Sequence, residues 1–324
     1  MFRPTPNSLM MKQSSSFPLF LFNTHVVRRA FSSSSRLHAE EKFVLFEEIP
    51  LSQIAPNLTT SNTASTTIGL VTINKPDKMN ALCPKTAIQF RELFESDQIC
   101  NNKNLGCLVL TGAKSNTQGK SAFSAGGDFD FLLERCNDQP FNNSARMLQF
   151  YNSFLTPLLK LCPIPTISAL NGHAIGAGLA IALATDIRFV EANAKLGVNF
   201  VNLGLSPGMA STYFLPYLLG HQSASALLLT GDLISAQKAL ELGMVYEVIE
   251  GEDQLRERAL EYAARIARNP PIATKLCLKN LRMQQLEGLE KMIIREADAQ
   301  AQSYADPILK QTIESLIRKS NEKK

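Results

Sequence analysis

The sequence contains few of the residues that hold metal ions or form disulfides. Its six cysteines include no CxxC pair, and only two histidines, His173 and His221, lie beyond residue 39. Zinc sites and disulfide frameworks need cysteines at characteristic spacings, and transition-metal sites usually need several imidazoles. We therefore expect the cysteines to be reduced packing residues, and we expect no bound metal.

The first 39 residues lack aspartate and glutamate altogether. They contain five basic residues and a serine-rich run that ends in RRAFSSSSR, a pattern typical of a mitochondrial transit peptide. Their one strongly apolar run, FPLFLF at 17–22, is too short for the roughly 20 residues that span a bilayer. We predict a removable leader at 1–39, a mature protein in the mitochondrial matrix, and no membrane span.

Without this leader the chain has no excess of positive charge. The sequence carries 33 basic and 29 acidic residues, so removing the five basic residues of the leader leaves 28 against 29, a net charge of −1. Nucleic-acid-binding proteins need a persistent basic face. The charge balance therefore argues against a nucleic-acid partner.

Short apolar runs rich in branched residues alternate with segments of helical length. The runs IGLVTI (68–73), CLVLTG (107–112) and PTISAL (165–170) are strand candidates, and KTAIQFRELFE, between the first two, has the length of a helix. This alternation predicts an α/β fold with buried parallel strands. The Ser/Thr/Asn-rich stretch at 50–67 predicts a long surface loop.

From about residue 252 the apolar residues recur at the spacing of a helix. Asp306-Pro307 is typical of a helix N-terminus and precedes the last segment. Two apolar faces result: Leu255, Ala259, Ala263 and Ile266 on one helix, and Ile308, Thr312, Ile313 and Leu316 on another. We divide the mature chain into a core at 40–251 and a helical region at 252–324. Such helices either close over the core or pair with another subunit.

Two glycine-rich turns precede helix-compatible sequence, in SAFSAGGDFDFLLE (121–134) and NGHAIGAGLAIALATD (171–186). The N–H of Ala177 is expected in the first turn of its helix, unpaired and at the positive end of the helix dipole. Gly127 offers a comparable N–H, and Asp128 is placed to cap the helix that follows. Two such amides that converge on one carbonyl stabilise an enolate. The alternative is that the glycines only permit close packing of helix on strand.

The stretch GLSPG at 204–208 matches the G-x-S-x-G pattern of serine hydrolases. In those enzymes the residue after the serine donates its backbone N–H to the oxyanion. Here that residue is Pro207, which has no N–H. We therefore interpret Ser206 as a turn residue.

Several segments in order resemble the crotonase superfamily, the enoyl-CoA hydratase and isomerase family. They are INKPDKMNAL (73–82), LVLTGA (108–113), FSAGGD (123–128), NGHAIGAGLAIALATDIR (171–188), AKLGVNFVNLGLSPG (194–208) and LTGDLISAQKALELGMV (229–245). The resemblance spans 43–320 and implies a spiral of β-β-α units, C-terminal helices for oligomerisation, and trimers or hexamers. It also implies a lyase or isomerase of fatty acid metabolism whose substrate is an acyl-CoA, with coenzyme A as part of that substrate and no separate cofactor.

The resemblance also implies roles for individual residues. It places the thioester carbonyl at the N–H groups of Gly127 and Ala177. It places coenzyme A along the backbone around Lys78, Met79 and Ala81. The remaining expected substrate-binding residues are Ala125, Asp128, Asn199 and Asn202.

Members of this family usually hydrate a double bond with two glutamates, and this chain lacks both. Their positions hold Ala180 and Phe200, and a third position used by some relatives holds Gly208. General acid and base groups contribute roughly 10²- to 10⁴-fold each, so their absence argues against standard hydration. Asn199 and Asn202 are able to orient a water but not to take its proton. His173 is able to take one, or else is a packed or capping residue.

Other assignments follow from the missing glutamates. We favour helix capping or a solvated helix face over catalysis for Asp128, Asp130 and Glu134.

Decarboxylation needs no protein base, because loss of CO₂ itself generates the enolate. Isomerisation and thioester hydrolysis each normally need an acid or a base. A catalytically silent protein that binds acyl-CoA is the remaining alternative.

Overall fold

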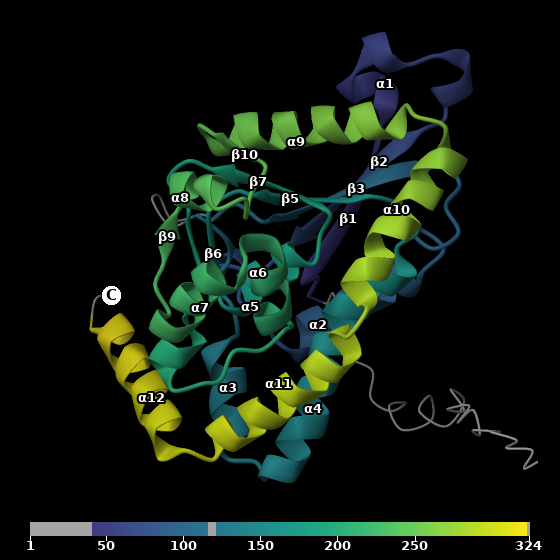
Figure 1. Cartoon of the computed structure of the whole chain (residues 1–324). Helices are drawn as coiled ribbons and strands as arrows, with labels where there is room; N and C mark the ends of the chain where they lie inside the picture. Colours follow the sequence, from purple (N-terminus) through teal and green to yellow (C-terminus); the bar gives the residue numbers. More distant parts are fainter. Residues whose placement is uncertain (1–40, 116–120, 323–324) are drawn as a thin grey trace, which may run out of the picture. The chain divides into compact units, whose positions relative to one another are not determined.

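Six strands form the main sheet of the computed structural model, which describes residues 41–115 and 121–322. The predicted leader at 1–39 lies outside the described residues. The strands are β1 (Val44–Pro50), β2 (Thr67–Ile73), β3 (Leu105–Gly112), β5 (Thr166–Leu170), β7 (Ile187–Glu191) and β10 (Glu247–Ile249), in the order β1-β2-β3-β5-β7-β10 (Figure 1). β1 is antiparallel to β2 and the other pairs are parallel. The three predicted strands are thereby confirmed as β2, β3 and β5.

A second, smaller sheet carries the two glycine-rich turns. Its strands are β4 (Ala122–Ser124), β6 (His173–Ile175), β8 (Lys195–Gly197) and β9 (Ile234–Ser235), in that order. β4 pairs in parallel with β6, and each leads through a turn into a helix, α3 (Phe129–Cys136) after β4 and α5 (Ala177–Leu183) after β6. Both turns therefore lie at neighbouring strand ends.

The remaining helices of the core lie on the same side of the main sheet as the smaller sheet (Figure 1). They are α2 (Pro84–Glu95), α4 (Pro140–Thr156), α6 (Ser211–Leu219), α7 (His221–Thr230) and α8 (Ala236–Glu241), and a π-helical turn extends α4 over Pro157–Leu161. Phe90 and Phe94 of α2 stack at 4.7 Å between ring centroids, and Phe154 of α4 lies 5.1 Å from Phe90. Aromatic burial of this kind fixes α4, which forms one wall of the candidate site.

The stretch predicted as a surface loop at 50–67 contains short helical turns. These are α1 (Leu51–Ile54) and two 3₁₀ turns, Pro56–Leu58 and Ser61–Thr63. Pro56 occupies the first position of its turn, where proline is favoured. The N–H of Thr60 donates to the Thr63 hydroxyl at 2.9 Å, which starts the next one. The composition signalled an irregular connection but not these local hydrogen bonds.

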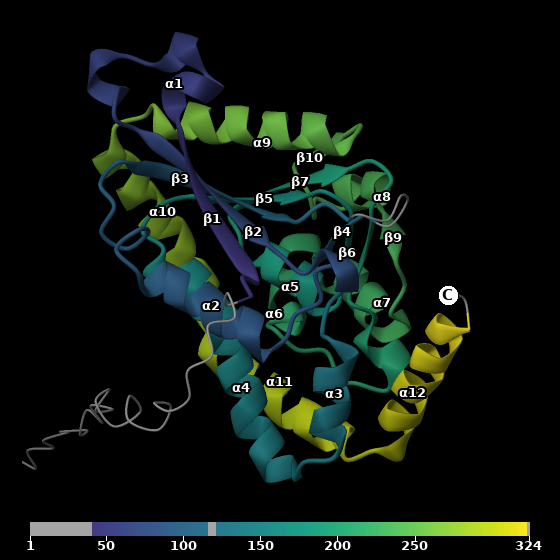
Figure 2. The same ribbon diagram turned by 180° about the vertical axis from the view of Figure 1, so that it is seen from behind.

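The four C-terminal helices close over the core, which is one of the two arrangements expected. They are α9 (Glu252–Ala267), α10 (Pro271–Leu286), α11 (Leu289–Tyr304) and α12 (Pro307–Asn321). α9 covers the outer face of the main sheet through Leu255, Ala259 and Ala263, which are fully buried, whereas α11 runs beside α4 (Figures 1 and 2). On α12, Leu309 and Ile313 are buried while Ile308 is exposed.

The cysteines form no disulfide in the part of the chain that the structure describes. Cys83, Cys107 and Cys162 are buried and act as packing residues, as expected. Cys277 is exposed on α10, so the packing interpretation is wrong for this residue. Among residues 41–115 and 121–322, none of the helices combines the length and the apolar character of a membrane span.

A buried arginine ties α10 to the main sheet, and we expect its removal to destabilise the fold. Arg282 donates to the Asp186 carboxylate at 2.7 and 3.1 Å and to the carbonyl of Cys162 at 2.6 Å. Arg282→Ala leaves the Asp186 charge uncompensated, so urea denaturation should show a loss of about 3–5 kcal/mol in the free energy of unfolding.

The matched control for this variant is Arg318→Ala. Arg318 is 76% exposed and pairs with Glu314 at 3.8 Å, so its loss should stay within about 0.5 kcal/mol. Equal destabilisation by the two variants would contradict the anchoring role of Arg282.

Candidate active site

The two glycine-rich turns touch because neither carries a side chain at the contact. Gly126 has φ of 94°, a region that favours glycine. A Cβ at Gly126 would lie 2.8 Å from the carbonyl oxygen of Ile175 and 3.6 Å from the nitrogen of Ala177. A Cβ at Gly178 would lie 2.5 Å from the carbonyl oxygen of Ser124. The glycines therefore do permit close packing, and this packing brings the two turns together.

Gly127 and Ala177 line the same cavity, and both have free N–H groups. Among the described residues, neither N–H has a hydrogen-bond acceptor. The hydrogen bonds beside Gly127 belong to its neighbours: Leu82 N–H donates to Gly126 O at 2.7 Å, and Asp128 N–H donates to Leu82 O at 2.9 Å. Ala177 is the first residue of α5, where backbone N–H groups lack intrahelical partners. One cavity thus contains two unpaired main-chain donors.

Asp128 has the capping role that the sequence predicted and is also held by ion pairs. Its carboxylate accepts from the N–H of Asp130 at 2.9 Å and pairs with Lys75 at 2.6 Å and Lys78 at 3.2 Å. Burial raises the pKa of this carboxyl, but the hydrogen bonds from Lys75 and the Asp130 N–H outweigh burial and leave the pKa below its ordinary value. The charged Asp128 therefore fixes the start of α3 directly after Gly127.

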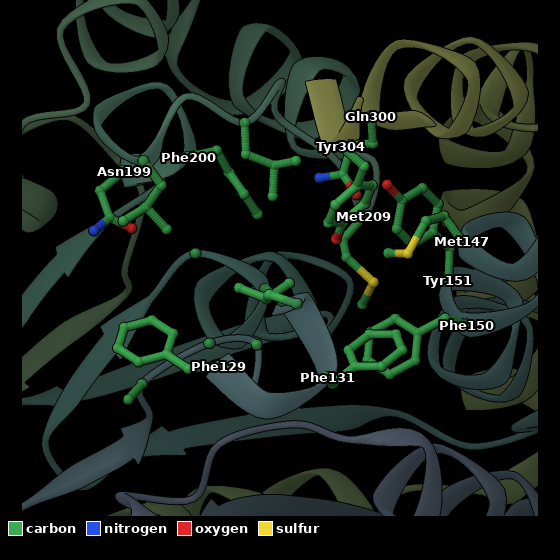
Figure 3. A pocket seen from close by; sticks show the side chains of 18 of the residues that line it. Phe129, Phe131, Met147, Phe150, Tyr151, Asn199, Phe200, Met209, Gln300 and Tyr304 are labelled. Carbon is green, nitrogen blue, oxygen red and sulfur yellow. The ribbon is translucent and has the colours of Figure 1, made fainter. Parts of the chain in front are cut away.

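The cavity has a volume of about 130 Å³ and a largely apolar wall (Figure 3). The apolar wall includes Phe131, Leu132, Met147, Phe150, Met209 and Leu316. In the described part of the chain, its lining includes no aspartate, glutamate, histidine, lysine or arginine. Phe200, one of the positions where the resemblance led us to expect a glutamate, lines it, whereas Ala180 is fully buried within α5 and does not line it. The tyrosines are thus its only titratable side chains among the described residues.

The structure brings some of the expected substrate-binding residues to the cavity. Ala125 and Asn199 line it. Met79, which has φ of 51°, accepts a hydrogen bond from the Ala125 N–H at 2.9 Å, so the segment expected to hold coenzyme A adjoins the first turn. Lys78 of this segment pairs with Asp130 at 2.6 Å in addition to Asp128, and Ala81 is buried.

His173 and Asn202, like the expected coenzyme A segment and Asp128, lie outside the cavity lining. The Nδ1 atom of His173 accepts a hydrogen bond from the N–H of Lys195 at 3.0 Å, which links β6 to β8. Asn202 donates to the carbonyl oxygen of Gly231 at 2.9 Å. Neither side chain lines the cavity. The geometry favours the packed or capping interpretation of His173 over the catalytic one.

Sequence reasoning missed four residues that shape the site. Lys75 was not singled out within INKPDKMNAL, because its partner Asp128 is 53 positions away. Tyr151 of α4 and Gln300 and Tyr304 of α11 also line the cavity. In the sequence they have no distinguishing pattern, since aromatic and polar residues on an amphipathic helix are compatible with ordinary packing.

A buried glutamate supports the loop that carries Met209. Glu296 of α11 accepts hydrogen bonds from the N–H of Ala210 at 2.6 Å and of Thr212 at 2.9 Å, and also from the Thr212 hydroxyl. Met209 and Ala210 both have positive φ, near 60°, so this loop is held in an uncommon conformation. Burial raises the pKa of Glu296 to about 7, although the hydrogen bonds from Thr212 and Ala210 act against it.

This shift predicts a pH-dependent stability. The folded-state pKa of Glu296, about 7, lies above its ordinary value of 4.5, so the folded state holds its proton more tightly than the unfolded chain. Its contribution is fully present below pH 4.5 and is lost as the pH rises to about 7. Over this range the free energy of unfolding of the wild type should fall relative to that of Glu296→Gln, which cannot titrate. If urea denaturation showed the free energies of unfolding of the wild type and Glu296→Gln changing in parallel with pH, the raised pKa of Glu296 would be contradicted.

Comparison with known proteins finds similarity to enoyl-CoA hydratases and to a CoA-thioester isomerase. The family model described as enoyl-CoA hydratase/isomerase matches residues 63–321. The short-chain-enoyl-CoA hydratase of Clostridium acetobutylicum is 30% identical over 252 residues, 78% of this chain and 92% of the relative. The 1,2-epoxyphenylacetyl-CoA isomerase of Escherichia coli is 32% identical over 231 residues, 71% of this chain and 84% of the relative.

Solved structures share the fold. An enoyl-CoA hydratase/isomerase from Mycobacterium paratuberculosis superposes with a TM-score of 0.68 and 25% identity, over 76% of this chain and 94% of the other. The enoyl-CoA hydratase from Bacillus halodurans gives a TM-score of 0.70 at 24% identity, over 85% of this chain and all of the other, and so shows the fold alone. The crotonase-like fold class is confirmed.

Proposed function

The chain belongs to the enoyl-CoA hydratase/isomerase family, and we propose that it binds an acyl-CoA thioester and stabilises the enolate of the acyl group. The observation that carries this proposal is the pair of unpaired N–H groups, of Gly127 and Ala177, on one apolar cavity. The names of the relatives, which act on CoA thioesters, support the substrate class. Coenzyme A is then part of the substrate and not a separate cofactor.

Enolate formation concentrates negative charge on the thioester oxygen. Donors fixed by the main chain need no reorganisation to meet that charge, and an apolar wall strengthens their effect. One such donor is typically worth about 3 kcal/mol of transition-state stabilisation. Because Gly127 and Ala177 contribute backbone atoms, the chemistry does not depend on their side chains.

Within this class, decarboxylation suits the cavity better than hydration or isomerisation. The three positions expected to hold an acid are Ala180, Phe200 and Gly208, and the described lining contains no carboxylate or imidazole. In a 2-carboxyacyl-CoA, the bond between the carboxylate carbon and the α carbon breaks. CO₂ leaves, the electron pair passes into the enolate, and the α carbon then takes a proton from water. No step requires a side-chain base.

We further propose that the protein works in the mitochondrial matrix as a trimer or hexamer. The acid-free, serine-rich leader pattern at 1–39 supports the location. α10 has exposed apolar side chains on one face, Ile272, Leu276 and Met283, which support association between copies of the chain.

Three thioesters distinguish the reactions. We expect purified protein to release CO₂ from methylmalonyl-CoA, and to bind crotonyl-CoA and 3-hexenoyl-CoA without hydrating the first or isomerising the second. Rapid hydration of crotonyl-CoA would contradict the decarboxylation proposal. Binding of all three esters without turnover would identify a catalytically silent binder. If no ester bound, the proposed substrate class would be wrong.

Gly126→Ala tests the paired donors. The new Cβ would press on the Ile175 carbonyl, 2.8 Å away, and separate the two turns. We expect kcat to fall by about 10²-fold, the typical effect of losing one oxyanion donor. If the protein is a silent binder, acyl-CoA affinity should fall instead. Gly243→Ala is the matched control, because Gly243 also has positive φ, 75°, but its Cβ would have no neighbour within 4 Å. Equal loss in both variants would contradict the role of the contact.

A further inference from the structure

Three polar side chains lie together at the inner end of the cavity. Tyr151 comes from α4, and Gln300 and Tyr304 come from α11; their exposed fractions are 0, 2 and 2%. Figure 3 shows them across the cavity from Asn199 and Phe129, of which Phe129 is 37% exposed at the outer end. We refer to these three residues as the inner polar cluster.

The inner polar cluster contains unpaired polar atoms in an otherwise apolar wall. The hydroxyls of Tyr151 and Tyr304 and the Oε1 atom of Gln300 have no hydrogen-bond partner within the described residues. A buried polar group without a partner is costly, and most such groups in folded proteins are paired. Three of them beside one cavity are therefore candidate partners for a polar group that enters it.

The positions of these groups are built into the fold. A Cβ at residue 208 would lie 2.3 Å from the Tyr151 hydroxyl and 2.7 Å from Gln300 Nε2, so only glycine leaves room for both side chains. Gln300 Nε2 donates to the carbonyl oxygen of Ser206 at 2.8 Å. This bond orients the amide and leaves its oxygen as the free acceptor. The glycine that replaces a family acid thus makes space for the inner polar cluster.

The electrostatics favour a neutral partner. Burial raises the pKa of both Tyr151 and Tyr304 well above the ordinary value, so both remain neutral hydroxyls. Interactions with Tyr304 and with Glu296 raise the pKa of Tyr151 further, and Glu296 in its ionised form disfavours an anion. A carboxylate would also lack a cation among the described lining residues. An ammonium would lose its hydration against Phe131, Phe150 and Met209.

A hydroxyl group fits the inner polar cluster better than a carbonyl. A hydroxyl is both a donor and an acceptor, so it is able to donate to Gln300 Oε1 and accept from a tyrosine O–H. A carbonyl only accepts and would leave Gln300 Oε1 unpaired. We infer that the inner polar cluster binds a hydroxyl group on the acyl chain, remote from the thioester, and that the protein selects such hydroxyacyl-CoA esters. This inference rests on the proposed binding of acyl-CoA.

The test compares matched pairs of unreactive esters. The affinity of the full chain is measured by isothermal titration with butyryl-, hexanoyl- and octanoyl-CoA, and with the ω-hydroxy counterpart of each. The lengthening acyl chain carries the hydroxyl to increasing depth in the cavity. We expect one ω-hydroxy ester to bind about 10-fold or more tightly than its plain counterpart. If the plain esters bind and no hydroxy ester is preferred, the inference is wrong and the groups pair with water alone. If none of the esters binds, the proposed function fails instead.

Removing the tyrosine hydroxyls tests whether the inner polar cluster causes the preference for the hydroxy ester. Tyr151→Phe combined with Tyr304→Phe removes the tyrosine donors but leaves Gln300 Oε1, so it should strongly reduce the preference for the hydroxy ester and leave the affinity for the plain ester equal or higher. Tyr217→Phe is the control, because Tyr217 lies on α6, half exposed and outside the cavity lining, and should change neither affinity. A preference that the double substitution leaves undiminished would overturn the inference, and retained binding of the plain ester shows that the variant is folded.

Discussion

The contact between the two glycine turns is the constraint on which the rest of the site depends. Gly126 and Gly178 each pack their backbone directly against the opposite turn. A Cβ added at either residue would lie within 2.8 Å of a carbonyl oxygen of that turn. The parallel pairing of β4 with β6 sets the strand ends side by side. Because the glycines allow the turns to touch, the N–H groups of Gly127 and Ala177 line one cavity.

The two ends of the cavity respond differently to sequence change. Main-chain donors at the glycine turns persist as long as the backbone path does, whereas side-chain chemistry is lost with a single substitution. This chain has Ala180, Phe200 and Gly208 where acids were expected, and it retains the paired turns. The absence of a side chain at Gly208 leaves room for Tyr151 and Gln300. Gly208, one of the positions where an acid was expected, thus leaves the space that these hydrogen-bonding groups occupy.

Features carried by contiguous segments could be predicted from the sequence. β2, β3 and β5 were visible as branched apolar runs, and the turn-to-helix junctions at Gly127 and Ala177 as glycines before apolar helical sequence. The inner polar cluster could not be predicted, because it forms only when α4 packs on α11, about 150 positions later. His173 looked suitable for catalysis by residue type, but its ring pairs with Lys195, a contact that depends on the register of β6 and β8.

The central claim is that two backbone N–H groups polarise one thioester carbonyl. Infrared difference spectroscopy of bound butyryl-CoA, carrying carbon-13 at that carbonyl, measures the polarisation directly. Our account predicts a stretching frequency below that of the free ester in water, and a return toward the free value in Gly126→Ala. A bound frequency equal to or above the free value would contradict the account.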